Sequence, residues 1–256
     1  MAEKTRIVNI AGVGIIFRES NPSEIFLEVK DDGHPIKLVR RQLCFIGGNW
    51  IGKTAKDDRN TLHTFRRELG EELSFDRPVR NSVRLALLGM ADIEEFAPTP
   101  DPSAKVTEED TDELARLKRV MVRTAIPFGD FLNTIPKAAL DAADPQNKRE
   151  GFTALCSYWQ IPLGENNWAR LVDLQTRFNN LSNESITVVT SLEEIIRTDT
   201  KTAFGHDWVL KEFFLDHGLK DAENLPLVHG TESVYAGMPM DSYNQYLRCY
   251  DVARHP

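Results

Sequence analysis

The sequence of 256 residues predicts an α/β or α+β fold, in which a mixed β-sheet is covered by helices within a single domain. Two observations lead to this prediction. Segments rich in Val and Ile, typical of strands, alternate along the chain with segments whose apolar residues recur every three or four positions, as in amphipathic helices. Such interleaving favours a sheet with helices packed against it.

The N-terminal segment TRIVNIAGVGIIFRES is dense in Val and Ile, so we expect a strand there. The letters NPSE suit a turn, and IFLEVKDDG follows them, which together predict a β-hairpin. A third apolar piece, IKLVRRQLCFIGGNWIG, runs into the glycines at positions 47 and 48. A polar loop is expected from there to Asp58.

A helix is predicted from Asp58 or Asn60 to Leu73. Four apolar residues at spacings of three, four and four form its core face: Leu62, Phe65, Leu69 and Leu73. The charged residues between 66 and 72 are expected on its other sides. Asp58 and Asn60 suit the N-cap, where a side-chain oxygen accepts from free backbone N–H groups. The following SVRLALLGMADIEEF is predicted to be another strand.

Residues 97–150 differ in composition and are expected to form an insertion. The segment opens with prolines, turns acidic, and predicts a surface helix from Thr107 or Thr111. VMVRTAIPFGDFLNTIP is interpreted as a strand interrupted at Pro127, and KAALDAADPQNKREG as a short helix and turn. Neither carries a recognisable chemical signature.

The last third has the clearest pattern. FTALCSYWQIPLG predicts a strand, ENNWARLVDLQTRFNNL an amphipathic helix, SITVVTSLEEII a strand entering a helix, and FGHDWVLKEFFLDHG a helix ending at Gly218. Residues 221–256 are expected to be a C-terminal extension, either packed on the domain or used as a partner surface. The whole chain, 1–256, is thus predicted to be one domain with an insertion and an extension.

Composition limits the function classes. The formal net charge of -8, from 31 basic and 39 acidic residues, disfavours non-specific attraction to long nucleic acids or anionic membranes. A polyanionic ligand would need local Arg or Lys, or a bridging metal. The three cysteines are far apart and odd in number, which fits neither a disulfide framework nor a zinc spacing. The run IAGVGIIF is too short to span a membrane, so we expect a cytoplasmic protein.

The stretch RRELGEELSF, residues 66–75, carries three glutamates within little more than one helical turn. Residues three and four apart share a helix face, so Glu71 and Glu72 both lie beside Glu68, and like charges at that spacing repel. A positive partner is expected there. Solvent with neighbouring Lys and Arg would suffice, whereas a divalent cation held by hard carboxylate oxygens is the more specific hypothesis.

An apolar strand, a glycine pair, a loop and a helix carrying Arg67-Glu68-Leu69-x-Glu71-Glu72 together resemble the Nudix family. This resemblance implies a Nudix-type α/β/α sandwich with a mixed sheet, mapped onto residues 5–95 and 150–216. It also implies Mg²⁺ or Mn²⁺ bound by Glu68, Glu71 and Glu72 with the carbonyl of Gly48. Arg67 would orient a glutamate through a charge-assisted hydrogen bond.

The first half of the Nudix signature departs from the family pattern. An ungapped count places Lys53 and Arg59 where the family has Gly and Glu, and Ser74 replaces the final Gly. A loop longer by a few residues would restore the pattern, with these substitutes: Gly48 or Gly52 for the glycine, and Asp57 or Asp58 for the glutamate.

Further site candidates lie outside the helix. Arg41, with Arg40 beside it, is expected to meet phosphate, although a strand edge also explains it, and Trp50 is expected either to stack on a base or sugar or to anchor the loop. Other carboxylates and one histidine are weaker candidates for a general base or a structural role: Glu94, Glu95, Glu193, Glu194 and His206.

The resemblance implies an enzyme that hydrolyses the diphosphate linkage of a nucleoside diphosphate derivative, with a nucleotide-type small molecule as its substrate. The sequence does not select among nucleotide sugars, dinucleotides, damaged triphosphates and capped ends, and it leaves a homodimer open. The main alternative is a non-catalytic binding or scaffold protein on the same fold. A third is a diphosphate isomerase, which would need a cysteine in the pocket, and Cys44 is the nearest.

Overall fold

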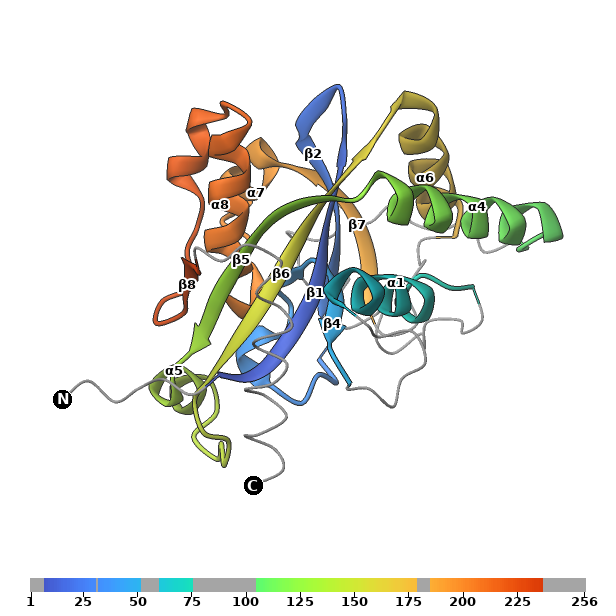
Figure 1. The fold of residues 1–256 in the computed structure, drawn as a ribbon. Coiled ribbons are helices and arrows are strands. Elements are labelled where there is room, and N and C mark those ends of the chain that lie inside the picture. The colour runs from blue at the N-terminus through green and yellow to red at the C-terminus, as the bar shows by residue number, and fades with distance from the viewer. Residues whose placement is uncertain (1–6, 31, 52–59, 76–104, 179–184, 237–256) are drawn as a thin grey trace.

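The computed structural model describes residues 7–30, 32–51, 60–75, 105–178 and 185–236 (Figure 1). Its described strands form a mixed sheet in the order β3-β2-β1-β6-β5-β8, with β4 also paired to β1 and β7 to β2. The long strands β1 (Ile7–Arg18) and β6 (Phe152–Leu163) run parallel at its centre, and the other described pairs are antiparallel. The predicted mixed sheet is confirmed.

The remaining strands are β2 (Asn21–Lys30), β3 (Leu43–Cys44), β4 (Ile46–Asn49), β5 (Ile126–Ile135), β7 (Ser185–Ser191) and β8 (Glu232–Tyr235). The predicted β1–β2 hairpin is present, but its turn lies at residues 19–20 and not at NPSE. Arg18 pairs with Asn21 while Phe17 pairs with Ile25, so the NPSE letters form an irregularity within the start of β2. Pro22 is tolerated there because a bulge does not require its missing N–H.

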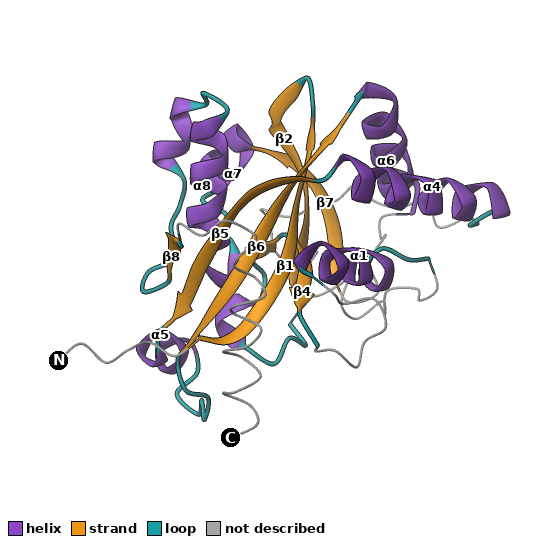
Figure 2. Ribbon diagram, in the orientation of Figure 1, coloured by secondary structure: helices purple, strands orange, loops and turns teal. Residues whose placement is uncertain are grey.

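Helices cover both faces of the sheet (Figures 1 and 2). On one side lie α1 (Thr61–Glu72), α4 (Glu108–Thr124) and α6 (Glu165–Phe178), and on the other lie α7 (Leu192–Thr198) and α8 (His206–Asp216). The short α5 (Lys137–Ala143) follows directly on β5. This arrangement confirms the expected α/β/α sandwich.

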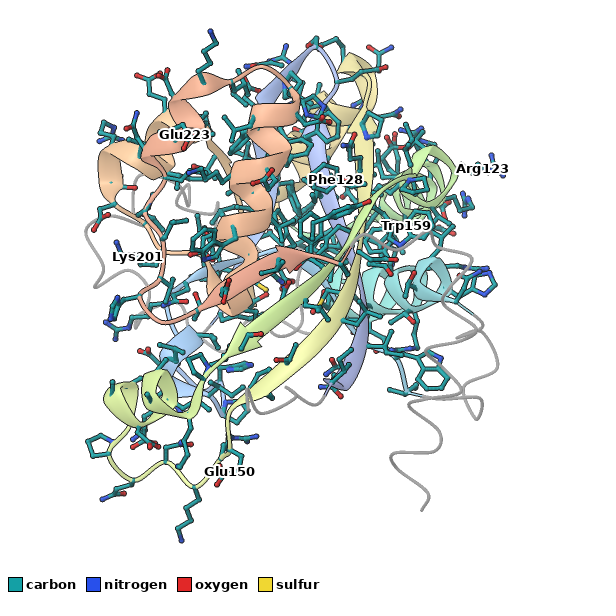
Figure 3. All side chains as sticks on the ribbon, turned by 60° about the vertical axis from the view of Figure 1, so that its left-hand side comes forward. Arg123, Phe128, Glu150, Trp159, Lys201 and Glu223 are labelled. Carbon is teal, nitrogen blue, oxygen red and sulfur yellow. The ribbon has the colours of Figure 1, made fainter. Side chains whose placement is uncertain are left out.

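Each face of the sheet has its own apolar core. Successive side chains of a strand point to opposite faces, so Ile15 and Phe17 of β1 enter one core and Ile16 enters the other. Phe128 of β5 packs against the core under α8, whereas Trp159 of β6 belongs to the core shared by α1, α4 and α6 (Figure 3). The interleaved pattern of the sequence therefore corresponds to two packed interfaces.

The helix α1 begins and ends close to the predicted positions. The side chain of Asn60 accepts a hydrogen bond from the backbone N–H of His63 at 2.9 Å, which settles the choice between Asp58 and Asn60 as its N-cap. Phe65, Leu69 and Leu73 are buried as expected, and Leu62 is partly buried. Glu72, one of the charged residues expected away from this core face, also has a buried side chain.

The segment predicted to be an insertion, residues 97–150, is built into the fold wherever the structure describes it. A capping box between Thr107 and Asp110 starts α4, as the sequence suggested, and Leu114, Leu117 and Met121 of this helix are buried in the core beside α1. The segment VMVRT is helical and not extended, because this apolar spacing of three and four continues α4 to Thr124. β5 then pairs with both β6 and β8.

Most of the other predicted elements lie where the pattern placed them. The irregular register at Pro127, the helix α5, the strands β6 and β7, and the helices α6 and α8 are all present, and Gly218 with a φ of 77° follows α8. Within the tail, β8 packs as an edge strand on β5. The strand expected in residues 82–96 and the tail beyond residue 236 lie outside the described residues. No helix in the described part of the chain is both long and apolar enough to cross a bilayer.

Glycine lets α1 approach the sheet closely. A Cβ atom at Gly12 of β1 would collide with the backbone carbonyl of Thr61, and one at Gly14 would collide with the ring of Phe65. By contrast, a Cβ at Gly70, on the exposed side of α1, would meet nothing within 4 Å. The close packing of α1 on β1 therefore requires glycine at positions 12 and 14 of the strand, whereas it does not require glycine at position 70 of the helix.

This contact predicts opposite effects for two glycine substitutions. Gly12→Ala should lower the free energy of unfolding by about 1–3 kcal/mol, because the helix must move off the strand. Gly70→Ala should raise it by about 0.5–1 kcal/mol through better helix propensity. Urea unfolding followed by circular dichroism measures both changes. Equal effects at the two positions would show that α1 does not lie on β1 as described.

Candidate active site

A cavity of about 620 Å³ opens beside α1, between the hairpin strands, the β3–β4 segment and the start of α8. Its lining includes Glu68 and Glu72 from α1, the Gly47–Asn49 backbone of β4, and Lys30 from β2. Apolar residues such as Ile36, Ile135 and Phe152 line other parts of it. The glutamate pair and the glycine pair of the sequence motif thus meet at one hollow.

Glu72 is the most deeply buried of the three motif glutamates. One carboxylate oxygen accepts a hydrogen bond from the backbone N–H of Gly47 at 3.0 Å, and the other lies 3.7 Å from the ammonium of Lys30. Burial raises the pKa of Glu72 well above its usual range, and repulsion from Glu28 and Glu68 adds to this effect, while Lys30 and the Gly47 N–H oppose it. The hydrogen bond from Gly47 and the nearby ammonium of Lys30 hold this carboxyl group at the cavity wall.

The glycine pair is required by the backbone and by the glutamates. Gly47 has a φ of 151°, and a Cβ there would meet the carbonyl oxygen of Gly12. A Cβ at Gly48 would collide with the carboxylate of Glu68, which lies directly against this backbone. Any larger residue at either position would displace β4 or the glutamate.

Arg67 links the other two motif glutamates. Its guanidinium lies 2.7 Å from a carboxylate oxygen of Glu68 and 3.0 Å from one of Glu71, and it donates to the carbonyl of Asn49 at 2.8 Å. Glu68 is mostly buried, with its side chain 15% exposed, whereas the side chain of Glu71 is 61% exposed. Glu71 does not line the cavity, so the structure brings Glu68 and Glu72 together there and leaves Glu71 at the helix surface.

Two charged residues on β2 complete the site, and sequence reasoning missed both. Glu28 is fully buried, and one of its oxygens accepts from Lys30 at 3.0 Å. Within the described residues its other oxygen has no hydrogen-bond partner. Burial alone would lower the pKa of Lys30, but attraction to Glu28 and Glu72 outweighs this and holds it well above the usual range. The only available signal was two charges two residues apart in the otherwise apolar stretch IFLEVK of this strand.

The two predicted substrate-binding residues lie elsewhere. Arg41 has a φ of 58° and makes a paired contact with Asp32, at 2.8 and 2.7 Å, on the protein surface. Trp50 is buried and packs with Ile10 and Leu155. Neither residue lines the cavity.

Of the carboxylates considered as a general base, Glu193 and Glu194 do not line the cavity. Glu94 and Glu95 lie outside the described residues. Glu194 caps α7 through Ser191, and Glu193 lines a different depression. A further depression of about 840 Å³ between α4 and α6 is larger than the cavity, but charged residues of both signs line it and none belongs to the sequence motif.

Cys44 and His206 face the cavity in their neutral forms. Burial raises the pKa of the Cys44 thiol to about 12, so it remains protonated at neutral pH and is a poor nucleophile. Burial and the nearby Lys30 lower the pKa of His206 to about 3. The backbone N–H of Phe45 donates to Nδ1 of His206 at 3.3 Å, which places the ring hydrogen on Nε2.

Oxygen donors at the cavity fit a small hard cation. Among the described residues, no three acidic, His or Cys side chains form a preformed metal cluster. Mg²⁺, however, is commonly held by one or two carboxylates together with phosphate oxygens and waters. Glu68 and Glu72, four residues apart on one helix and facing the same cavity, match that requirement. The backbone of Gly48 lies against the carboxylate of Glu68.

Comparisons with known proteins add a distant structural likeness. The chain matches no protein-family model and no curated protein. Among solved structures it is similar to a Nudix hydrolase from Alicyclobacillus acidocaldarius, with 10% sequence identity and a TM-score of 0.38, over 89% of this chain and 88% of that one. A likeness at this level carries no argument about chemistry, which has to come from the geometry of the cavity.

The neutral state of His206 predicts a pH dependence of stability. Its pKa of about 3 in the folded state lies below the unfolded value of 6.5, so the folded state binds fewer protons and loses stability as pH falls below 6.5. Between pH 7 and pH 5 this amounts to about 2 kcal/mol. In urea titrations, the free energy of unfolding of His206→Gln should change less between pH 7 and pH 5 than that of the wild type, by about this amount. The exposed His229→Gln serves as the control, and parallel pH profiles for wild type and His206→Gln would contradict the assignment.

Proposed function

We propose that this protein is a metal-dependent, Nudix-type pyrophosphohydrolase that cleaves the diphosphate linkage of a nucleoside diphosphate derivative. The observation that carries the proposal is the convergence of Glu68, Glu72 and the Gly47–Gly48 backbone on one cavity. Carboxylates four residues apart on a rigid helix, facing a glycine backbone, suit the binding of a hard cation beside a phosphate group.

Glu68 and Glu72 would hold Mg²⁺ or Mn²⁺, with the carbonyl of Gly48 as a further oxygen donor. When bound, such an ion polarises phosphoryl oxygens and lowers the pKa of an attacking water. The protein would contribute positioning. Arg67 holds the Glu68 carboxylate at 2.7 Å and is itself fixed by the carbonyl of Asn49. The Gly47 N–H fixes one oxygen of Glu72, and the other oxygen lies on the side of Lys30.

The size and lining of the cavity support a nucleotide-type ligand. A volume of about 620 Å³ lies in the range of small-molecule sites, which are concave, largely apolar and carry a few polar groups. Glu68, Glu72, Lys30 and Arg149 supply its charged part, while Ile135 and Phe152 belong to its apolar lining. The apolar lining would take the nucleoside, and the charged part would take the diphosphate.

A non-catalytic nucleotide-binding protein is the second candidate. The buried pairing of Glu72 with Lys30 favours it, because an ammonium already compensates one carboxylate that a metal would need. The isomerase alternative is disfavoured, since the Cys44 thiol remains protonated at neutral pH.

The activity test measures the products that the purified protein forms from a panel of nucleoside diphosphate derivatives with Mg²⁺ or Mn²⁺, by mass spectrometry. The wild type should release a nucleoside monophosphate or diphosphate from at least one compound. Glu68→Gln and Glu72→Gln should each lower the rate by about a hundredfold or more, because each removes a carboxylate at the cavity. Glu212→Gln, at an exposed position on α8, should act as the wild type does. Nucleotide binding without any turnover would favour the binding-protein alternative.

Metal binding is tested separately by thermal stability. Mg²⁺ at about a hundred times its dissociation constant should raise the free energy of unfolding by about 2.7 kcal/mol, since it binds only the folded state. Glu68→Gln should abolish this gain. Glu71→Gln should keep most of it, because the Glu71 side chain is 61% exposed and lies outside the cavity. Loss of the gain in Glu71→Gln but not in Glu68→Gln would reverse the assignment of the ligands.

A further inference from the structure

We propose that Lys30 is a phosphate-binding residue, a fixed cation that contacts the diphosphate of the ligand independently of any metal. This inference rests on the proposed function, because it takes the ligand of the cavity to be a diphosphate. It concerns a strand that carries none of the residues of the sequence motif, and four structural observations support it.

The first observation is that the lysine is held rigidly. β2 is paired with β1, β3 and β7, so Lys30 sits in the interior of the sheet and not on a free edge. Its backbone N–H donates to the carbonyl of Gln42 at 3.1 Å, and its own carbonyl accepts from the N–H of Arg41 at 2.7 Å. The side chain is only 11% exposed. A cation placed in this way loses little further entropy when it binds an anion.

The second observation is that the ammonium has unused hydrogen-bonding capacity. A lysine ammonium carries three N–H donors. Within the described residues, that of Lys30 makes one hydrogen bond, to Glu28 at 3.0 Å. The oxygen of Glu72 lies at 3.7 Å, which is an ion-pair distance but too long for a hydrogen bond. A nearly buried ammonium with donors to spare, in a residue that lines a cavity, indicates a polar ligand.

The third observation concerns how the ammonium is positioned. Glu28 is fully buried and does not line the cavity, so it can hold the ammonium from the protein interior without itself contacting a ligand. The other ionisable groups next to Lys30 are Glu72, which faces the cavity, and the neutral Cys44 and His206. Two Lys or Arg residues line the cavity, Lys30 and the exposed Arg149, and of these Lys30 is the nearly buried one that lies beside Glu72.

The fourth observation is the charge that a ligand would meet. Glu68 faces the cavity as the carboxylate of an ion pair with Arg67, and it would repel an anion that approached without a compensating positive charge. A diphosphate has more anionic oxygens than a single cation bound at two carboxylates would contact. Lysine is a common phosphate ligand that acts as a point charge. Glu68 and Glu72 would then bind the metal, and Lys30 would bind phosphate directly.

The test measures binding of inorganic diphosphate by calorimetry in the presence of EDTA, so that no divalent ion contributes. The wild type should bind, with an affinity that falls as salt is added. Lys30→Met, which keeps the length of the side chain without its charge, should weaken binding by about tenfold or more. Lys220→Met, at an exposed position, is the matched lysine control. Glu68→Gln should bind at least as well as the wild type, because it removes a repelling carboxylate.

Lys30→Met leaves Glu28 buried without its cation and can therefore unfold the protein. The double variant Glu28→Gln with Lys30→Met removes both charges, and circular dichroism establishes that it is folded. Its diphosphate affinity should then be compared with that of Glu28→Gln alone. Equal affinities would overturn the proposal, as would a wild type that does not bind diphosphate without metal. Diphosphate binding that depends on Lys30 in a protein that hydrolyses nothing would instead support the lysine site and refute the hydrolase.

Discussion

The helix α1 can lie directly on β1 because Gly12 and Gly14 present no side chain where the helix crosses the strand. This close approach brings one face of α1 against the β4 backbone, so that Glu72 reaches the N–H of Gly47 and Glu68 lies against Gly48. A helix packed at an ordinary distance from the sheet would separate these groups. The cavity and its charged wall therefore depend on backbone contacts that only glycine allows.

Burying three carboxylates near one another costs free energy unless cations or hydrogen bonds compensate them. The structure meets this requirement unevenly. Glu68 is paired with Arg67, Glu72 is shared between Lys30 and a backbone N–H, and Glu28 has only one of its oxygens occupied within the described residues. Incomplete compensation of this kind is typical of sites that bind charged ligands and metals. Lys30 is therefore part of the charged wall of the cavity, together with Glu68 and Glu72.

How far the sequence predicts the fold follows from its periodicities. Density in Val and Ile predicted the N-terminal strand, and apolar residues three and four positions apart predicted α1 and α6, and these elements are present. The prediction was wrong at the boundary between α4 and β5, where a helical pattern passes into a strand pattern. VMVRT is rich in β-branched residues, yet it continues α4, because burial of Leu117 and Met121 against α1 and α6 outweighs the intrinsic preference of those few residues.

The sequence by itself determined a mixed sheet covered by helices, and a helix that carries three glutamates and an arginine within little more than one turn. Helical geometry places these residues near one another whatever surrounds them. Only the tertiary structure decided which glutamates face the cavity, because Glu68, Glu71 and Glu72 are equivalent in sequence until α1 is packed on a particular strand. The same packing buried Trp50 and brought Glu28 and Lys30 beneath the helix. Such contacts join residues distant in the chain, and no local pattern encodes them.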